Sequence, residues 1–288
     1  DEAKNTDPSV FVVGTSIGAT EEYFKAGFGK YCDAYDFHCY ESPQNITQSL
    51  ANYQELFKKY GEPRPIWSTE IGLNSQGIAR GAVADDMVKK FALFFAGGGA
   101  NMSWFDLLYP DPDAKIVGSS GESFNVIDAR YLQYAPKVTA VTYYDLINSI
   151  AIKKFVQQKQ YAEGVHAFLF RDKDNHQLQI IWKDKGRLDT FVPLPGVSAL
   201  EIIRLGGAHC ALQPESKGVT LTVDEDPLLL LYDGDAPLAE KLAAPAATVT
   251  MPAGIVRAAV TNIAVQAAGV APADVNLVAP PFWQVSKT

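Results

Sequence analysis

Glu70 is the residue of this chain whose type and position point most directly to catalytic chemistry. It closes the apolar run that starts at Pro65, and it comes just before Gly72 and Asn74. If this run is a strand, its side chains alternate between two faces. One predicted face then carries Ile66, Ser68 and Glu70, and the other carries Trp67, Thr69 and Ile71. In a parallel α/β barrel, catalytic groups collect at the carboxyl ends of the strands. We therefore expect Glu70 to be catalytic rather than a solvated turn residue.

Two further predicted strands carry side chains that suit the same site. His38 and Tyr40 share a face of the run 34–40, and Trp104 lies in the run 101–107. A parallel sheet would bring a carboxylate, an imidazole, a phenol and an indole together at the carboxyl ends of its strands. Such a set suits sugar hydrolysis, in which a carboxylate attacks or stabilises the anomeric carbon and a polar neighbour holds it ionised. An aromatic ring packs against the apolar face of a pyranose.

This chemistry assigns an expected role to each candidate. Glu70 is expected to be the nucleophile, and His38 and Tyr40 are expected to orient it and the substrate. From its residue type alone, Trp104 suits packing in the core as well as stacking on a sugar ring. Asn74 either lines the pocket or shapes the turn that follows the strand, and the residue type favours the turn.

The first half of the chain alternates predicted strands and helices. The strands are predicted at 10–16, 34–40, 65–71 and 101–107, and the helices at 20–30, 46–60, 78–96 and 136–149. Repeated βα units of this length indicate a parallel sheet with helices outside. Within this arrangement Asp36 lies behind His38 and Tyr40, and Trp67 is expected to face the helix layer as part of the core.

The pattern changes after about residue 150. Strand-like runs are separated by polar turn signals at 172–175 and 183–186. The predicted strands cover 167–170, 178–182, 200–204, 219–223 and 228–232. This pattern is typical of an antiparallel β-sandwich. We expect three regions: an α/β region over 1–150, the sandwich over 151–235, and a linker with part of a further β module over 236–288.

Composition excludes several classes of function. The chain has 288 residues and a net charge of -8, without basic clusters, so nucleic-acid binding has no electrostatic footprint. No apolar run reaches the length of a membrane span. The 3 cysteines and 4 histidines have no metal-ligand spacing. We therefore expect no metal, no cofactor, no nucleic acid and no membrane partner.

At these residues the chain resembles the clan of retaining (β/α)8-barrel glycoside hydrolases. The run 33–40 looks like their sixth strand with its His-x-Tyr pair, and 67–72 looks like their seventh strand with its nucleophile Glu. The run 103–105 is similar to their eighth strand with its substrate-stacking Trp, so the resemblance implies that Trp104 stacks on a sugar ring. The run 7–14 is similar to their entry into strand five. The region after the barrel resembles the side domain of the family 39 xylosidase-like members. The resemblance implies the C-terminal half of a (β/α)8 barrel, a carbohydrate substrate, and a secreted or periplasmic protein.

The chain departs from this clan at the acid/base. The clan places that Glu after an Asn at the end of strand four, and no Asn-Glu dipeptide occurs here. The resemblance therefore implies half of an active site, in which Glu41 is a weak candidate for a substitute acid. Because a half-barrel has open edges and an exposed apolar face, we expect association with a missing N-terminal half or with a second copy.

Two other classes of function remain open at the level of the sequence. The chain could be a non-catalytic carbohydrate-binding or scaffold fragment, in which the sandwich binds polysaccharide. An unrelated α/β enzyme is disfavoured because no phosphate-binding glycine motif follows a predicted strand.

Overall fold

The structure is a computed structural model of the chain. It describes residues 2–14, 18–108, 123–128, 134–215, 217–234, 247–250 and 264–267. The chain divides into two units, Asp1–Leu238 and Ala239–Thr288. The described part of the second unit is an antiparallel pair of strands, β14 (Ala247–Thr250) and β15 (Ala264–Ala267). The candidate chemistry lies in the first unit.

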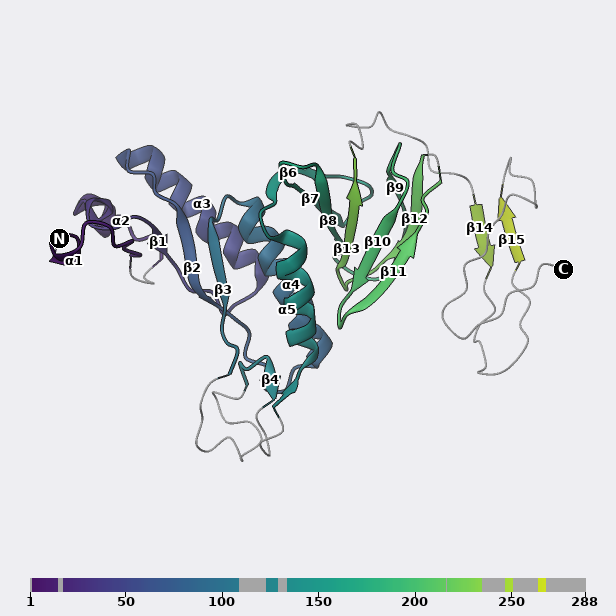
Figure 1. The fold of residues 1–288 in the computed structure, drawn as a ribbon, viewed down its shortest axis with the longest axis horizontal. Coiled ribbons are helices and arrows are strands. Elements are labelled where there is room, and N and C mark those ends of the chain that lie inside the picture. Colours follow the sequence, from purple (N-terminus) through teal and green to yellow (C-terminus); the bar gives the residue numbers. More distant parts are fainter. Residues whose placement is uncertain are drawn as a thin grey trace. The chain divides into compact units, whose positions relative to one another are not determined.

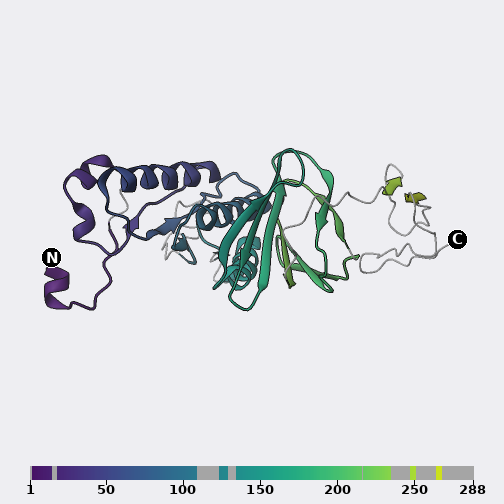
Figure 2. The same ribbon diagram turned by 90° about the horizontal axis from the view of Figure 1, so that it is seen from above.

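The first unit begins with βα units, as the sequence predicts. Its parallel sheet has the order β1–β2–β3. The strands are β1 (Tyr35–Asp36), β2 (Ile66–Ile71) and β3 (Asn101–Trp104). The connecting helices are α3 (Pro43–Tyr60) and α4 (Arg80–Ala96). Both helices pack on the same side of this sheet (Figures 1 and 2). Shorter helices precede it: α1 (Glu2–Thr6), α2 (Glu21–Lys25) and the 3-10 turn η1 (Phe28–Lys30).

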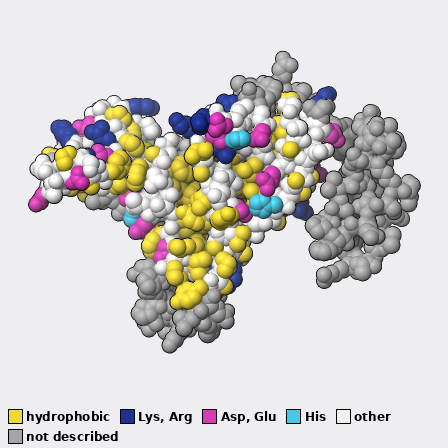
Figure 3. Space-filling model, in the orientation of Figure 1, with side chains coloured by type: hydrophobic (Ala, Val, Ile, Leu, Met, Phe, Trp, Pro, Cys, Tyr) yellow, Lys and Arg dark blue, Asp and Glu magenta, His cyan; other side chains and the backbone are white. Residues whose placement is uncertain are grey.

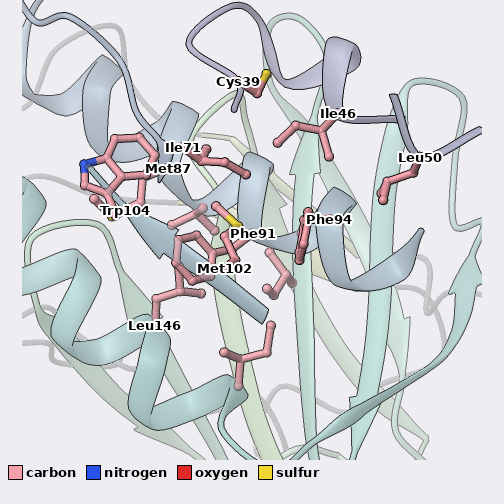
Figure 4. Packing of buried hydrophobic residues seen from close by; sticks show 14 of the residues in the cluster. Cys39, Ile46, Leu50, Ile71, Met87, Phe91, Phe94, Met102, Trp104 and Leu146 are labelled. Atoms are coloured by element: carbon pink, nitrogen blue, oxygen red, sulfur yellow. The ribbon is translucent and has the colours of Figure 1, made fainter. Parts of the chain in front are cut away.

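Helix α3 has clear local signals at both ends. Pro43 occupies its first turn, where the missing N–H costs no hydrogen bond. Gly61 ends it in the left-handed conformation at φ 71°, and its N–H donates to the Phe57 carbonyl. Between these ends Ile46 and Leu50 recur at helical spacing and are buried. They pack towards Phe94 of α4 and Ile71 of β2 in one apolar layer (Figure 4).

The second half of the first unit is antiparallel, in agreement with the sequence. Six strands form a sheet of order β11–β10–β13–β8–β7–β6, and β9 pairs with β12. The strands of the large sheet are β6 (Lys154–Lys159), β7 (Val165–Arg171), β8 (His176–Lys183), β10 (Leu200–Arg204), β11 (Ala208–Leu212) and β13 (Leu228–Asp233). The ribbon consists of β9 (Leu188–Pro193) and β12 (Gly218–Val223). The predicted turn at 172–175 joins β7 to β8, with Asn175 at φ 70°.

The large sheet is buried on both faces. One face packs with β9 and β12 around residues such as Ile181, Val192 and Val223. Residues of the other face, such as Phe170 and Ile180, belong to the same core cluster as α4 and α5 (Val138–Ile150). The antiparallel region is therefore attached to the βα region by a shared core. The fold class is α/β, as predicted.

Several predicted elements differ from the structure. The run 10–16 makes only an isolated parallel bridge, between Val13 and Ala34, and residues 15–17 are not described. The predicted helix 20–30 is two short pieces, because Gly27 adopts φ 69° between them. The sequence did not predict β6, β9 or β11, whose exposed or half-buried residues weaken the apolar signal. The small antiparallel pair β4 (Ile127–Asp128) and β5 (Ala135–Pro136) was also not predicted.

The described residues contain no helix long and apolar enough to cross a membrane. Cys32 and Cys39 are buried and Cys210 is exposed, and all three are free thiols. No group of three or more His, Cys, Asp or Glu side chains in the described residues is placed to hold a metal ion.

Candidate active site

Three of the predicted site residues meet at the carboxyl ends of the parallel strands. The Tyr40 hydroxyl donates a hydrogen bond to Oε2 of Glu70. Nδ1 of His38 lies 3.2 Å from the same carboxylate oxygen. His38 and Tyr40 follow β1 and Glu70 lies in β2, and the isolated bridge between Cys39 and Ile71 keeps the two segments aligned. The Glu70 side chain is 37% exposed, so it is reachable from solvent.

A bulge in β2 turns Glu70 toward these partners. The register between β2 and β3 shifts between Ser68 and Ile71. As a result Ile71 is buried on the same side as Ile66 and Ser68, whereas Thr69 and Glu70 lie together on the open side. The strict alternation that placed Glu70 with Ile66 and Ser68 is therefore wrong. The Ser68 hydroxyl, which donates to the Phe37 carbonyl at 2.5 Å, holds the bulged segment against the neighbouring strand.

The burial of the two tryptophans is the opposite of the prediction. Trp104 is only 7% exposed and belongs to the core cluster, where Nζ of Lys90 from α4 lies 5.8 Å from its ring centroid (Figure 4). Trp67 is half-buried on the opposite face of the sheet and stacks on Phe11 at 5.0 Å. The expectations of a sugar platform at Trp104 and of a core residue at Trp67 are corrected accordingly. An indole enclosed by the helix layer presents no face to a sugar.

A buried carboxylate extends the group behind His38. Asp36 is 3% exposed, and its two oxygens accept from the N–H and the hydroxyl of Thr69, each at 2.8 Å. The Thr69 hydroxyl oxygen lies 3.0 Å from Nε2 of His38. The sequence placed Asp36 behind His38 correctly, but it assigned Thr69 to the face opposite Glu70.

The surroundings of Tyr40 keep its phenol protonated, so that it can donate a hydrogen bond. Burial, together with the hydrogen bond and the negative charge of Glu70, raises the pKa of its phenol well above the ordinary value. Phe105 and Phe124 contact its ring edge-to-face at 6.1 and 5.4 Å. Asp106, a further carboxylate near this group, has its pKa raised by burial and by Glu70, while Lys137 opposes the shift.

The remaining candidates serve the surrounding loops. Oδ1 of Asn74 accepts from the Gln76 N–H at 2.9 Å, so Asn74 shapes the turn after β2. Glu41 is exposed and accepts from the Tyr40 N–H at 3.1 Å. The acidic loop residues Asp111 and Asp113 lie outside the described residues.

Replacing Tyr40 by Phe tests the phenol alone, because the ring contacts with Phe105 and Phe124 remain. If Glu70 is the nucleophile that the strand motifs predict, we expect its rate of attack to fall about 10- to 100-fold in this variant, since a hydrogen bond to a charged group contributes roughly 1.5–3 kcal/mol. The loss should appear in kcat/KM for an activated aryl glycoside. An unchanged rate would show that the phenol does not assist Glu70.

A buried lysine supports the turn that carries Glu70. Lys90 of α4 is fully buried, and its Nζ donates to the Gly72 carbonyl at 2.7 Å and pairs with Asp86 at 2.8 Å. Gly72 itself has no room for a side chain, because a Cβ there would lie 2.6 Å from the Phe105 carbonyl oxygen. The turn after β2 is thus fixed by the hydrogen bond from Lys90 of α4 and by close contact with the backbone that follows β3.

Comparison with known proteins identifies the fold. No family model matches the sequence, and no curated protein matches it. A family 39 glycoside hydrolase from Bacteroides cellulosilyticus WH2 superposes with a TM-score of 0.66 over 80% of this chain, at 15% identity. The fold is that of glycoside hydrolases. A glucosidase from Croceicoccus marinus gives a TM-score of 0.55 over 80% of this chain at 12% identity. A family 86 glycoside hydrolase in complex with neoagarooctaose gives 0.52 over 86% at 12% identity.

These glycoside hydrolases are longer than this chain. The superposed part covers 52% of the family 39 structure, 62% of the Croceicoccus glucosidase and 49% of the family 86 structure. The resemblance to glycoside hydrolases that the strand motifs indicate is confirmed for the fold. The chain spans about half of the length of such a protein.

Proposed function

We propose that this chain carries the nucleophile half of a retaining glycoside hydrolase. The observation that supports this proposal best is the carboxylate of Glu70, contacted by the Tyr40 phenol and the His38 imidazole at the carboxyl end of a parallel strand. The phenol donates to the carboxylate, and the open side of β2 leaves that carboxylate accessible. A glycoside hydrolase fold provides the context in which these three groups act on a sugar.

The proposed reaction is a double displacement. One carboxylate oxygen of Glu70 attacks the anomeric carbon, and the bond from that carbon to the leaving-group oxygen breaks with its electron pair. The result is a glycosyl ester on Glu70. Water then attacks the anomeric carbon and gives one proton to the carboxylate that served as the general acid, the ester bond breaks, and Glu70 regains its charge. Tyr40 holds the carboxylate in place in both steps, because its raised pKa keeps the phenol protonated.

The proton for the leaving group comes from a carboxyl group outside this chain. Retaining enzymes place their two carboxyl groups about 5–5.5 Å apart. We propose that strands β1, β2 and β3, with the segment at Val13, are the sixth, seventh, eighth and fifth strands of a (β/α)8 barrel. The antiparallel region is then the β-sandwich side domain of that enzyme. A polypeptide with the first four strands would supply the acid/base.

The exposed surface of the βα region supports the proposal that further barrel strands pack against it. Parallel sheets are normally covered on both faces, yet Asn101 and Ser103 of β3 are exposed on the face away from α3 and α4. Large hydrophobic side chains are also exposed, including Tyr144 of α5 at 66%. In the orientation of Figure 3, hydrophobic side chains gather over β3 and α5. A partner carrying further βα units would cover such a surface.

Covalent trapping tests the proposal directly. The chain is incubated with dinitrophenyl glycosides that carry fluorine on the carbon next to the anomeric carbon, which slows the second displacement. Because dinitrophenolate leaves without a proton, the missing acid is not needed for the first step. We expect a mass increase of one fluoroglycosyl group on the peptide that contains Glu70.

Two variants control this trapping experiment. Glu70→Gln should lose the label, whereas Glu41→Gln, which removes an exposed carboxylate nearby, should keep it. A panel of glycosides identifies the sugar that reacts. Retention of the chain on polysaccharide gels without labelling of Glu70 by any sugar of the panel would favour the carbohydrate-binding function instead.

A further inference from the structure

We infer that Asp36 and Thr69 are positioning residues that keep a proton on Nε2 of His38, so that an ionised Glu70 faces an imidazolium rather than a bare nitrogen. The consequence for catalysis rests on the proposed function, whereas the protonation itself is a property of the folded chain. The inference follows from the hydrogen-bond capacity of four side chains in contact.

The first step concerns the Thr69 hydroxyl, which has one proton to donate. An ionised carboxylate only accepts hydrogen bonds. Oδ1 of Asp36 takes the Thr69 N–H and Oδ2 takes the Thr69 hydroxyl, both at 2.8 Å. The hydroxyl proton is therefore committed to Asp36. Because Asp36 is 3% exposed, these bonds replace the hydration that its carboxylate has lost.

The second step concerns Nε2 of His38. This nitrogen lies 3.0 Å from the Thr69 hydroxyl oxygen and 3.5 Å from Oδ2 of Asp36. With the hydroxyl proton pointing at Asp36, both neighbours are acceptors. Nε2 must then donate, which means that it carries a proton in the neutral as well as in the charged ring.

The third step concerns the other ring nitrogen, which faces Glu70. In a neutral ring with its proton on Nε2, Nδ1 is an acceptor and would oppose a carboxylate oxygen at 3.2 Å. That oxygen already accepts from Tyr40. The contact is favourable only if a proton lies between Nδ1 and Glu70. When Glu70 is ionised, as a nucleophile must be, His38 therefore carries protons on both nitrogens.

The charges that face His38 agree with this assignment. Asp36 and Glu70 contact it from β1 and β2, and Asp106 lies near enough to Glu70 for the Glu70 charge to raise the pKa of Asp106. Lys137, the cation of this group, acts on Asp106. An imidazolium between two carboxylates is thus the positive charge that orients Glu70. Formation of the glycosyl ester removes the negative charge of Glu70, and hydrolysis of the ester restores it.

Nitrogen NMR of the intact chain tests the inference without any substrate. The imidazole nitrogens are labelled with ¹⁵N, and the His38 signals are identified by their loss in His38→Gln among the 4 histidines. We expect Nε2 of His38 in the wild type to resonate as a protonated nitrogen, and Nδ1 to do so wherever Glu70 is ionised. A bare Nε2 in the wild type would overturn the inference before any variant is made.

Asp36→Asn gives a sharper result because it should reverse the hydrogen bonds. The Asn amide oxygen takes the Thr69 N–H, so the amide nitrogen faces the Thr69 hydroxyl as a donor. The hydroxyl proton is then released toward Nε2 of His38. We expect the Nε2 signal to shift to the range of an unprotonated nitrogen, while Nδ1 stays protonated. Thr69→Ser keeps the hydroxyl and should leave the wild-type pattern.

The outcomes separate this inference from the proposed function. A protonated Nε2 in Asp36→Asn, as in the wild type, would show that Asp36 does not set the protonation of His38. The expected NMR shifts without covalent trapping at Glu70 would preserve the positioning role and remove the glycosidase. Trapping at Glu70 with an unprotonated wild-type Nε2 would do the reverse.

Discussion

Replacing Glu70 by Ala should reduce turnover of a dinitrophenyl glycoside by a factor on the order of 10⁴ or more, because the variant has no group to attack the anomeric carbon. The leaving group needs no proton, so the assay depends only on the nucleophile that we propose for this chain. Glu70 is 37% exposed and makes its hydrogen bonds through side chains of other strand ends, so its removal should leave the core intact.

Added azide gives this prediction a second readout. The Ala side chain leaves space that a small anion can enter, next to the donors Tyr40 and His38. We expect azide to restore part of the turnover and to yield a glycosyl azide whose anomeric configuration is opposite to that of the substrate, since one displacement then replaces two. Glu41→Ala is the matched control and should retain wild-type turnover. Equal losses in the two variants would contradict the role of Glu70.

Replacing Lys90 by Met should destabilise the chain by about 3–5 kcal/mol, the usual cost of leaving one member of a buried ion pair without its partner. Lys90 is 0% exposed and pairs with Asp86 on the preceding turn of α4. Met retains the length of the side chain but cannot donate to Asp86 or to the Gly72 carbonyl. The free energy of unfolding is measured by urea denaturation.

The pH dependence of this loss has a definite sign. Burial raises the pKa of Asp86 to about 6, although Lys90 opposes the shift. Without Lys90 this pKa rises further, so the folded variant binds a proton that the unfolded chain releases at a lower pH. Its stability deficit is therefore largest above the folded pKa and becomes smaller as the pH falls toward 5 and Asp86 is protonated.

Two further variants control this stability prediction. Lys25→Met removes an exposed partner of Glu21 at the same helical spacing and should change the free energy of unfolding far less. The double variant Lys90→Met with Asp86→Leu removes the unpaired charge, so it should recover much of the stability. A loss in Lys90→Met that is the same at pH 5 and pH 8 would show that Asp86 is not its cause.

The sequence by itself determined the class of the fold and which three candidate residues lie together. Helix α3 was readable because Pro43 and Gly61 bracket an apolar pattern of helical period. Strand β2 was readable because its apolar residues stand together between turn residues. His38, Tyr40 and Glu70 could be grouped because the ends of parallel strands meet at one edge of a sheet, whatever the details of the packing.

Only the tertiary structure decided which way the side chains of β2 and β3 point. Side chains alternate with a period of two only while the pairing of neighbouring strands is regular. The bulge between Ser68 and Ile71 changes the register between β2 and β3, and no local sequence signal predicts this change. That shift places Thr69 beside Glu70. The opposite faces of Trp67 and Trp104 depend likewise on which side of the sheet α4 covers, and this depends on packing between segments far apart in the sequence.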